Sequence, residues 1–328
     1  MGPDPKSPGS GSFPADFRAA LVAGWILLAT AGLLYAHFKQ LPAWVAIPVL
    51  GAFLLEYLFY LLPAFPDLRR RLAAAPFPAL VVLSFVLPYF ICYGPMGHLS
   101  FANLVKLVAV GLAVGLWYVV LPASFFTDFA FLVLLAAVLL SRLFDSIYPV
   151  VYPGLPIAIL GRISFFLAAI LVLLIQRRVG DAGYGFIPNL REWRIGALHY
   201  LAFLPAAACV AFPLKAVHLV TPAPLWKTIG IFLGFLWVVA LFEEFLFRGV
   251  LLGWIEERGG RRTAALLITS MLFGFVHLWF RGFPNWRGAL LAAMLGWFCG
   301  HARIQAGSIR AGVVTHALVV ATWRGFLA

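Results

Sequence analysis

The sequence predicts an all-α protein: a polytopic transmembrane helix bundle with about 10–11 spans. The first observation is composition: 63% of the residues are hydrophobic, 11% are charged, and the mean hydropathy is +0.99. A soluble domain carries about a quarter charged residues, so this chain lacks the polar side chains that would cover a water-facing surface of its size. The second observation is the absence of the alternating segments of about ten residues that are typical of membrane barrels. Lipid is therefore the solvent for much of the chain.

Apolar stretches of about 20 residues, the length that crosses a bilayer, recur along the whole chain. In order, the predicted spans cover residues 19–38, 42–63, 77–96, 101–121, 126–145, 156–176, 196–213, 226–255, 262–280, 287–305 and 308–327. The stretches 101–121 and 196–213 are the weakest and could instead be re-entrant or interfacial. Within 101–121, Gly111 and Gly115 form a G-x-x-x-G pair, which is typical of close helix packing.

The polar stretches divide the chain into four parts. Residues 1–16 are rich in Gly, Pro and Ser and are expected to form a disordered tail with no cleavable signal peptide. Residues 17–176 are expected to form an N-terminal transmembrane bundle of unassigned role. Residues 177–195, the longest polar stretch after the tail, are predicted to be a cytoplasmic or interfacial linker. Residues 196–328 form the C-terminal unit.

The net charge of +12 does not indicate a nucleic-acid partner. The basic residues occur in short clusters between apolar runs, as in Arg69–Arg71, which is how basic residues set membrane orientation. With the N-terminus in the cytoplasm, the cytoplasmic loops hold fourteen basic residues and the opposite loops hold six. We therefore expect a multi-pass protein of the cell membrane with a cytoplasmic N-terminus.

Ionisable side chains within a span cost several kcal/mol unless they are paired, so each one is a functional candidate. Those within the predicted spans are Glu56, Lys106, Arg142, Arg162, Glu243, Glu244 and Arg248. Arg142 and Arg162 fall near span ends, where they are expected to extend to the headgroups. Glu56 and Lys106 fall deeper and are expected to form a structural ion pair or to lie at a water-exposed kink.

Glu243 and Glu244 are adjacent acids in the middle of an apolar helix. Residues four apart share a helix face, so Glu244 is expected to pair with Arg248 and to have a structural role. Glu243 points about 100° away from that pair and lacks its partner. The sequence therefore predicts that Glu243 is the chemically active residue, a general base.

Two histidines follow in the next helices. His277 ends the run Phe273-Gly274-Phe275-Val276-His277, and His316 lies within the last predicted span. Together with Glu243 they would supply a carboxylate base, an imidazole that helps hold a water molecule, and a second imidazole that steadies a developing oxyanion.

The order and spacing of these residues resemble the CPBP group, also called the Abi or CAAX-protease-like family, which includes the type II CAAX prenyl endopeptidases. That family carries E-E-x-x-x-R, then F-x-x-x-H, then a third motif that begins with His. Here the motifs are Glu243-Glu244-x-x-x-Arg248, Phe273-x-x-x-His277 and His316, within about residues 226–320.

The resemblance implies a glutamate-dependent intramembrane endopeptidase whose core is residues 196–328. It implies that Glu243 and His277 activate water, that His316 contributes to the oxyanion site, and that Glu244 and Arg248 support them. The implied partners are the lipid bilayer and a membrane-associated or lipid-modified protein substrate.

No cofactor is expected. Two His and two Glu could bind zinc, but neither H-E-x-x-H nor another compact ligand motif is present, so a metal-free water mechanism is favoured. The three cysteines, Cys92, Cys209 and Cys299, all fall in apolar segments. They are expected to be packing residues rather than disulfide partners or metal ligands.

One position departs from the family pattern. The third motif carries Asn four residues after its His as a second oxyanion donor, and this chain has Val320 there. Losing an oxyanion donor costs about 100- to 1000-fold in rate, unless Thr315 or Thr322 substitutes. Two other functions therefore stay open: a non-catalytic Abi-type immunity or scaffold protein, and an ion-coupled transporter whose buried charges form a relay.

Overall fold

The computed structural model describes residues 15–74, 76–180, 183–259, 261–280 and 282–327. Within these ranges the regular structure is helical, and the isolated bridge between Leu219 and Leu327 belongs to no strand, so the predicted all-α class is confirmed. The chain divides into two compact units, Met1–Arg177 and Arg178–Ala328. Of the predicted tail, residues 1–14 lie outside the described part, and α1 begins at Ala15.

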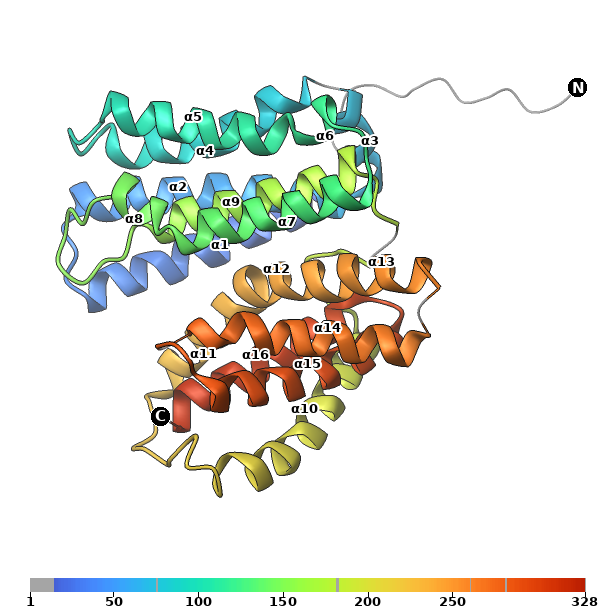
Figure 1. The fold of residues 1–328 in the computed structure, drawn as a ribbon. Coiled ribbons are helices and arrows are strands. Elements are labelled where there is room, and N and C mark those ends of the chain that lie inside the picture. Colours follow the sequence, from blue (N-terminus) through green and yellow to red (C-terminus); the bar gives the residue numbers. More distant parts are fainter. Residues whose placement is uncertain (1–14, 75, 181–182, 260, 281, 328) are drawn as a thin grey trace, which may run out of the picture. The chain divides into compact units, whose positions relative to one another are not determined.

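The N-terminal unit consists of helices joined by short turns (Figure 1). In chain order they are α1 (Ala15–Phe38), α2 (Ala43–Leu61), α3 (Pro66–Ala74), α4 (Phe77–Tyr93), α5 (Phe101–Gly115), α6 (Trp117–Val120), α7 (Phe125–Leu140), α8 (Leu143–Ile147) and α9 (Ile159–Leu171). α9 continues as a π-helical turn through Val172–Gln176 and is the most deeply buried of these helices. α4 packs against α2, α5 and α9.

The close packing of α4 on α5 depends on the two glycines of the G-x-x-x-G pair. A Cβ on Gly111 would lie 2.9 Å from Val82 Cα, and one on Gly115 would lie 3.1 Å from Val81 Cβ. Neither separation leaves room for a side chain. The two helices lie side by side in Figure 1, as the sequence predicts.

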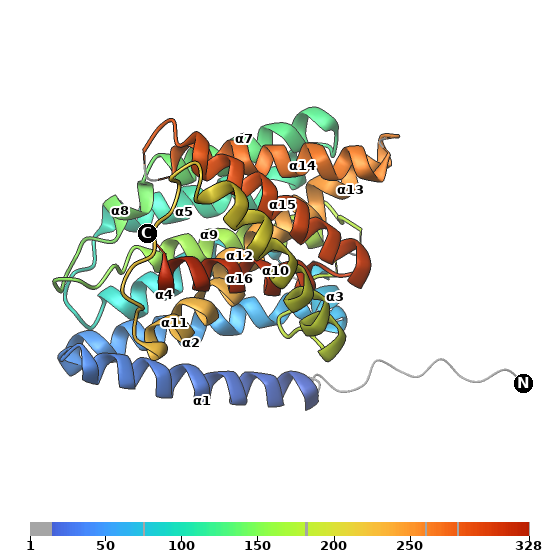
Figure 2. The same cartoon turned by 90° about the horizontal axis from the view of Figure 1, so that it is seen from below.

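The C-terminal unit is built around α16, which packs against α10, α11, α12 and α15 (Figure 2). Its helices are α10 (Leu190–Ala211), α11 (Leu225–Gly234), α12 (Ala240–Glu244), α13 (Leu252–Glu257), α14 (Arg262–Val276), α15 (Trp286–Ala306) and α16 (Ile309–Phe326). α11, α12 and α13 belong to one helical run of 33 residues. Two π-helical segments, Phe235–Val239 and Phe245–Leu251, interrupt it on either side of α12.

α10 begins inside the predicted linker 177–195, because its first turn is capped there. The side chain of Asn189 accepts a hydrogen bond from the Glu192 backbone (3.0 Å), and Glu192 accepts one from the Asn189 backbone (2.7 Å). This capping box satisfies two otherwise unpaired N–H groups. Glu192 also pairs with Arg310 at 2.7 Å, which joins the start of α10 to the start of α16.

Every predicted span coincides with a helix or a helical run, but fewer helices meet the requirements of a span. Six are long and apolar enough to cross a membrane, or up to seven if the bent pair formed by α3 and α4 counts as one. α5 and α7 are apolar but short, and α15 and α16 are more polar. The chain is thus an all-α polytopic bundle, and length and composition alone support fewer spans than the predicted number.

The charged groups predicted inside the N-terminal spans do not form one site. Glu56 is 2% exposed and accepts a hydrogen bond from Ser164 Oγ (2.7 Å), whereas Lys106 is exposed. Neither residue takes part in an ion pair among the described residues, so the structural ion pair, one of the two alternatives expected for them, is not formed. Arg142 and Arg162 do extend outward, and both pair with Asp145, at 2.9 and 2.7 Å.

Candidate active site

The glutamate pair lies at the end of α12, between the two π-helical segments. π-helical turns inside α-helices are frequent at functional sites, because the extra residue changes which side chains face the interior. Glu244 is completely buried, whereas the side chain of Glu243 keeps 25% of its surface exposed. The two neighbouring acids thus have different environments, and only Glu243 has exposed side-chain surface, although its Oε2 is buried.

Glu244 pairs with Arg248, as the four-residue spacing predicts. Arg248 Nη1 donates to Glu244 Oε1 over 3.2 Å, and both side chains are 0% exposed. The guanidinium also lies over the ring of Phe273, with its Cζ 4.4 Å from the ring centroid. A cation at that distance is attracted to the face of the ring. Arg248 is therefore held by an ion pair and by a cation–π contact, with no exposure to solvent.

Gly296 on α15 makes room for that guanidinium. A Cβ at this position would lie 2.6 Å from Arg248 Nη2 and 3.1 Å from Ser270 Cα. We expect Gly296→Ala to lower the thermal stability of the purified protein, because either the buried arginine or the backbone of α14 must move. Gly253→Ala is the matched control, since a Cβ there meets nothing within 4 Å and alanine favours a helix. Equal melting temperatures for the two variants would contradict this role of Gly296.

His316 connects the two glutamates. Its Nδ1 lies 3.0 Å from Glu244 Oε1, and its Nε2 lies 3.7 Å from Glu243 Oε2. An ionised carboxylate only accepts hydrogen bonds. In a hydrogen bond to ionised Glu244, Nδ1 of His316 therefore carries a proton and is the donor. This bond fixes the orientation of the ring and directs Nε2 toward Glu243. His316 thus joins the buried ion pair to the partly exposed acid.

His277 lies at the end of α14, in the 3-10 turn His277–Trp279, and is half-buried. Its Nδ1 lies 2.7 Å from the carbonyl oxygen of Phe273. The Phe273 ring is 4.5 Å from the ring of His277 and 5.6 Å from that of His316, between centroids. Among the described residues no hydrogen bond or ion pair joins His277 to Glu243, so His316 is the imidazole nearer to the pair of acids.

The two threonines considered as substitutes for the missing asparagine are both engaged. Thr315 donates to the carbonyl oxygens of Gly196 (2.9 Å) and Ala311 (3.1 Å). The Thr322 hydroxyl is 2.7 Å from that of Tyr200. Thr315 has one proton, which the two carbonyls share, so it has none to give to an oxyanion. The structure therefore offers no replacement donor at Thr315.

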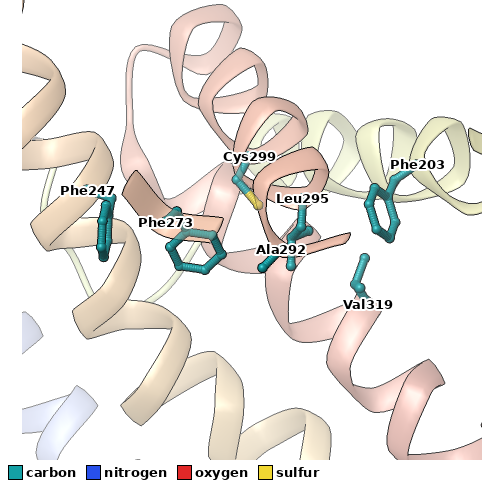
Figure 3. Close-up of a cluster of buried hydrophobic side chains, with 7 residues drawn as sticks. All are labelled: Phe203, Phe247, Phe273, Ala292, Leu295, Cys299 and Val319. Carbon is teal, nitrogen blue, oxygen red and sulfur yellow. The ribbon is translucent and has the colours of Figure 1, made fainter. Parts of the chain in front are cut away.

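A buried apolar cluster lies beside these polar groups and contacts them through Phe273. Figure 3 shows its seven side chains. The cluster brings together side chains from α10, α14, α15, α16 and the π-helical segment that follows α12, namely Phe203, Phe247, Phe273, Ala292, Leu295, Cys299 and Val319. Such a cluster of apolar side chains excludes water and thereby strengthens the electrostatic interactions beside it.

The cysteines follow the sequence-based expectation only in part. All three are free thiols, and Cys92 and Cys299 are buried, whereas Cys209 is exposed and is not a packing residue. Cys299 also lies beside Glu244 and His316, and one ligand-type atom from each of the three residues falls within 4.8 Å of the others. No sequence motif indicates this grouping, because Cys299 belongs to none of the motifs.

Helices that cross a membrane and enclose paired acids, an arginine and a histidine define a class: a polytopic membrane protein with a buried ionisable site. Comparison with known protein families gives a match over part of the chain. Residues 225–322 match the family model described as Rce1-like, type II CAAX prenyl endopeptidase. This match confirms the resemblance to the CPBP family over the segment that carries the three motifs. No curated protein and no solved structure matches the chain.

Proposed function

We propose that the protein is an intramembrane endopeptidase in which Glu243 activates a water molecule to hydrolyse a peptide bond. The observation that supports this most strongly is the placement of His316 between Glu243 and the buried Glu244–Arg248 pair. A base, an imidazole beside it and a group that orients the imidazole form the arrangement that nucleophile-activating sites share. The family match supports a CAAX-protease-like function in general terms.

In the proposed reaction, Glu243 accepts a proton from water as the water oxygen attacks the carbonyl carbon of the peptide bond. The tetrahedral intermediate collapses, the C–N bond breaks, and the proton passes to the leaving amine, which yields a new carboxyl terminus and a new amino terminus. His316 Nε2 lies 3.7 Å from Glu243 Oε2. With a proton taken up from solvent before the attack, this nitrogen is placed to donate to the oxyanion and stabilise it. His277, the histidine of the F-x-x-x-H motif that begins at Phe273, would help to position the water molecule.

The substrate we propose is a membrane-associated or lipid-modified protein, because the site is built from helices among which several are long and apolar enough to cross a membrane. The bilayer is then the environment of both enzyme and substrate, and we place the protein in the cell membrane with its N-terminus in the cytoplasm. No cofactor is part of the proposal, and water is the only co-reactant of the hydrolysis.

The experiment that tests the proposal is a comparison of membrane-protein termini in cells that produce wild-type protein or Glu243→Ala at matched levels. We expect a set of new amino termini that depends on the wild-type protein and disappears with the variant. The same termini in both samples would contradict the proposed endopeptidase activity.

A second candidate function is a non-catalytic scaffold of the Abi type. Val320 and the engagement of the Thr315 hydroxyl with two backbone carbonyls favour it, because both remove donors from the oxyanion site. This function predicts that Glu243→Gln, which keeps size and shape, preserves the cellular phenotype of the gene. Loss of the phenotype at normal membrane levels of the variant would exclude it.

A further inference from the structure

Glu244, Cys299 and His316 bring three kinds of metal ligand together from three different helices. A carboxylate oxygen from α12, the thiol sulfur from α15 and an imidazole nitrogen from α16 lie within 4.8 Å of one another, and all three residues are buried. Thiolate, imidazole and carboxylate are the groups that bind zinc in proteins. The motif residues alone do not form this set, because Cys299 belongs to no motif.

Glu244 has one oxygen available for such an ion. Its Oε1 accepts hydrogen bonds from Arg248 and His316, whereas its Oε2 is buried with no hydrogen-bond partner. A buried polar atom without a partner is costly, so Oε2 gains from any cation that reaches it. Gly312 leaves this space open, because a Cβ there would lie 3.1 Å from Glu244 Oε2 and 3.0 Å from the Cys299 carbonyl oxygen.

The charges of the site also favour a cation. Glu243 and Glu244 carry two negative charges when ionised, and Arg248 supplies one positive charge. A divalent ion that displaces the thiol proton of Cys299 adds one net positive charge, which would make the site neutral. Arg248 Nη1 lies 3.2 Å from the other carboxylate oxygen, Glu244 Oε1, and its positive charge repels the ion. We therefore expect moderate affinity rather than the very tight binding of a structural zinc site.

We propose that a thiophilic divalent metal ion of the zinc type binds Glu244 Oε2, Cys299 Sγ and His316 Nδ1. In a tetrahedral zinc site the ligand atoms lie roughly 3.3–3.8 Å apart, so the three side chains must close by about 1 Å. The ion replaces the thiol proton, which leaves to solvent. The Nδ1 proton moves to Nε2, so the imidazole stays neutral while it binds the metal through Nδ1.

The consequence for the reaction rests on the proposed function. With the ion on Nδ1, His316 loses the 3.0 Å hydrogen bond to Glu244 that fixes the orientation of its ring. As the three ligands close on the ion, the ring moves and Nε2 leaves the position from which it would stabilise the oxyanion. The metal is therefore an inhibitor, and the site is a zinc-sensitive switch within the catalytic centre.

The binding test uses purified full-length protein carrying no histidine tag, with Cd²⁺ as the probe, because a thiolate bound to cadmium absorbs in the ultraviolet. We expect one Cd²⁺ per chain with a thiolate-to-cadmium band in the wild type. Cys299→Ser, which keeps the size of the side chain, should lose the band. Cys209→Ala and Cys92→Ala are matched controls and should keep it, since neither thiol belongs to the cluster.

Two outcomes would overturn the proposal. An unchanged band in Cys299→Ser would place the ion on another thiol, and no band in the wild type would show that the cluster does not take up the ion. Both results are independent of proteolysis, so they would leave the proposed endopeptidase function standing. Circular dichroism of Cys299→Ser separates a lost ligand from a lost fold.

The inhibition test compares each variant with itself, with and without Zn²⁺. We expect Zn²⁺ to lower the cleavage rate of the wild type at least tenfold and a chelator to restore it. In Cys299→Ser the cleavage rate with Zn²⁺ should be nearly the same as the cleavage rate without it. Equal inhibition of the wild type and Cys299→Ser would contradict the switch, whereas a wild type with no cleavage under any condition would contradict the proposed function and leave the cadmium result intact.

Discussion

Replacing Arg248 by methionine is expected to destabilise the C-terminal unit by about 3–5 kcal/mol, the cost of leaving one member of a buried ion pair without its partner. Both side chains of the Glu244–Arg248 pair are 0% exposed, so water cannot compensate Glu244. Methionine fills much of the volume but brings no charge. The variant also loses the contact with the face of Phe273.

Thermal unfolding of the purified protein in detergent measures this effect. Arg262→Met is the matched control, because Arg262 pairs with Glu256 at 3.1 Å while its side chain is 63% exposed. An exposed pair contributes about 0–1 kcal/mol, so its loss should barely change the midpoint. Glu244→Gln in combination with Arg248→Met should recover part of the stability, since no unpaired charge remains. Equal midpoints for Arg248→Met and Arg262→Met would contradict the structural role of the buried pair.

Replacing Glu243 by glutamine is expected to slow peptide cleavage by about 100- to 10,000-fold, the usual contribution of a general base. Glutamine has nearly the same size and cannot accept the proton of the attacking water at neutral pH. The side chain of Glu243 is 25% exposed and its helix is held by Glu244 and Arg248, so we expect the fold to survive.

Single-turnover cleavage in proteoliposomes, with a peptide identified from the membrane-protein termini, measures the rate. Glu257→Gln is the control, because Glu257 is an exposed acid at the end of α13 in the same helical run. Its rate should match that of the wild type. If Glu243→Gln also cleaves at the wild-type rate, Glu243 is not the base.

Local rules predicted much of this structure. Apolar length placed a helix at every predicted span, and the i,i+4 spacing predicted the pairing of Glu244 with Arg248. The G-x-x-x-G pair predicted close packing of α5 on another helix, and the structure shows that this helix is α4. These features depend on residues near one another in the sequence or on the length of one segment.

The rest depends on how distant helices pack. His316 meets Glu244 although the two lie 72 residues apart, and no pattern within either helix indicates the contact. Cys299 joins them from α15 for the same reason. The π-helical segments around α12 change the direction of side chains along that run, which a regular helical period cannot anticipate. A structural ion pair, one of the two alternatives expected for Glu56 and Lys106, is not formed, because Lys106 is exposed on α5 while Glu56 faces Ser164.

The central claim is that Glu243 and His316 act together in one step of the hydrolysis, Glu243 as the base for the water and His316 as the donor to the oxyanion. The most direct test is a double-mutant cycle on the single-turnover cleavage rate, with Glu243→Gln, His316→Gln and the double variant. Residues that act together in one step give losses far from additive. We predict that the double variant is no slower than the slower of the two single variants, whereas losses that multiply would contradict the claim.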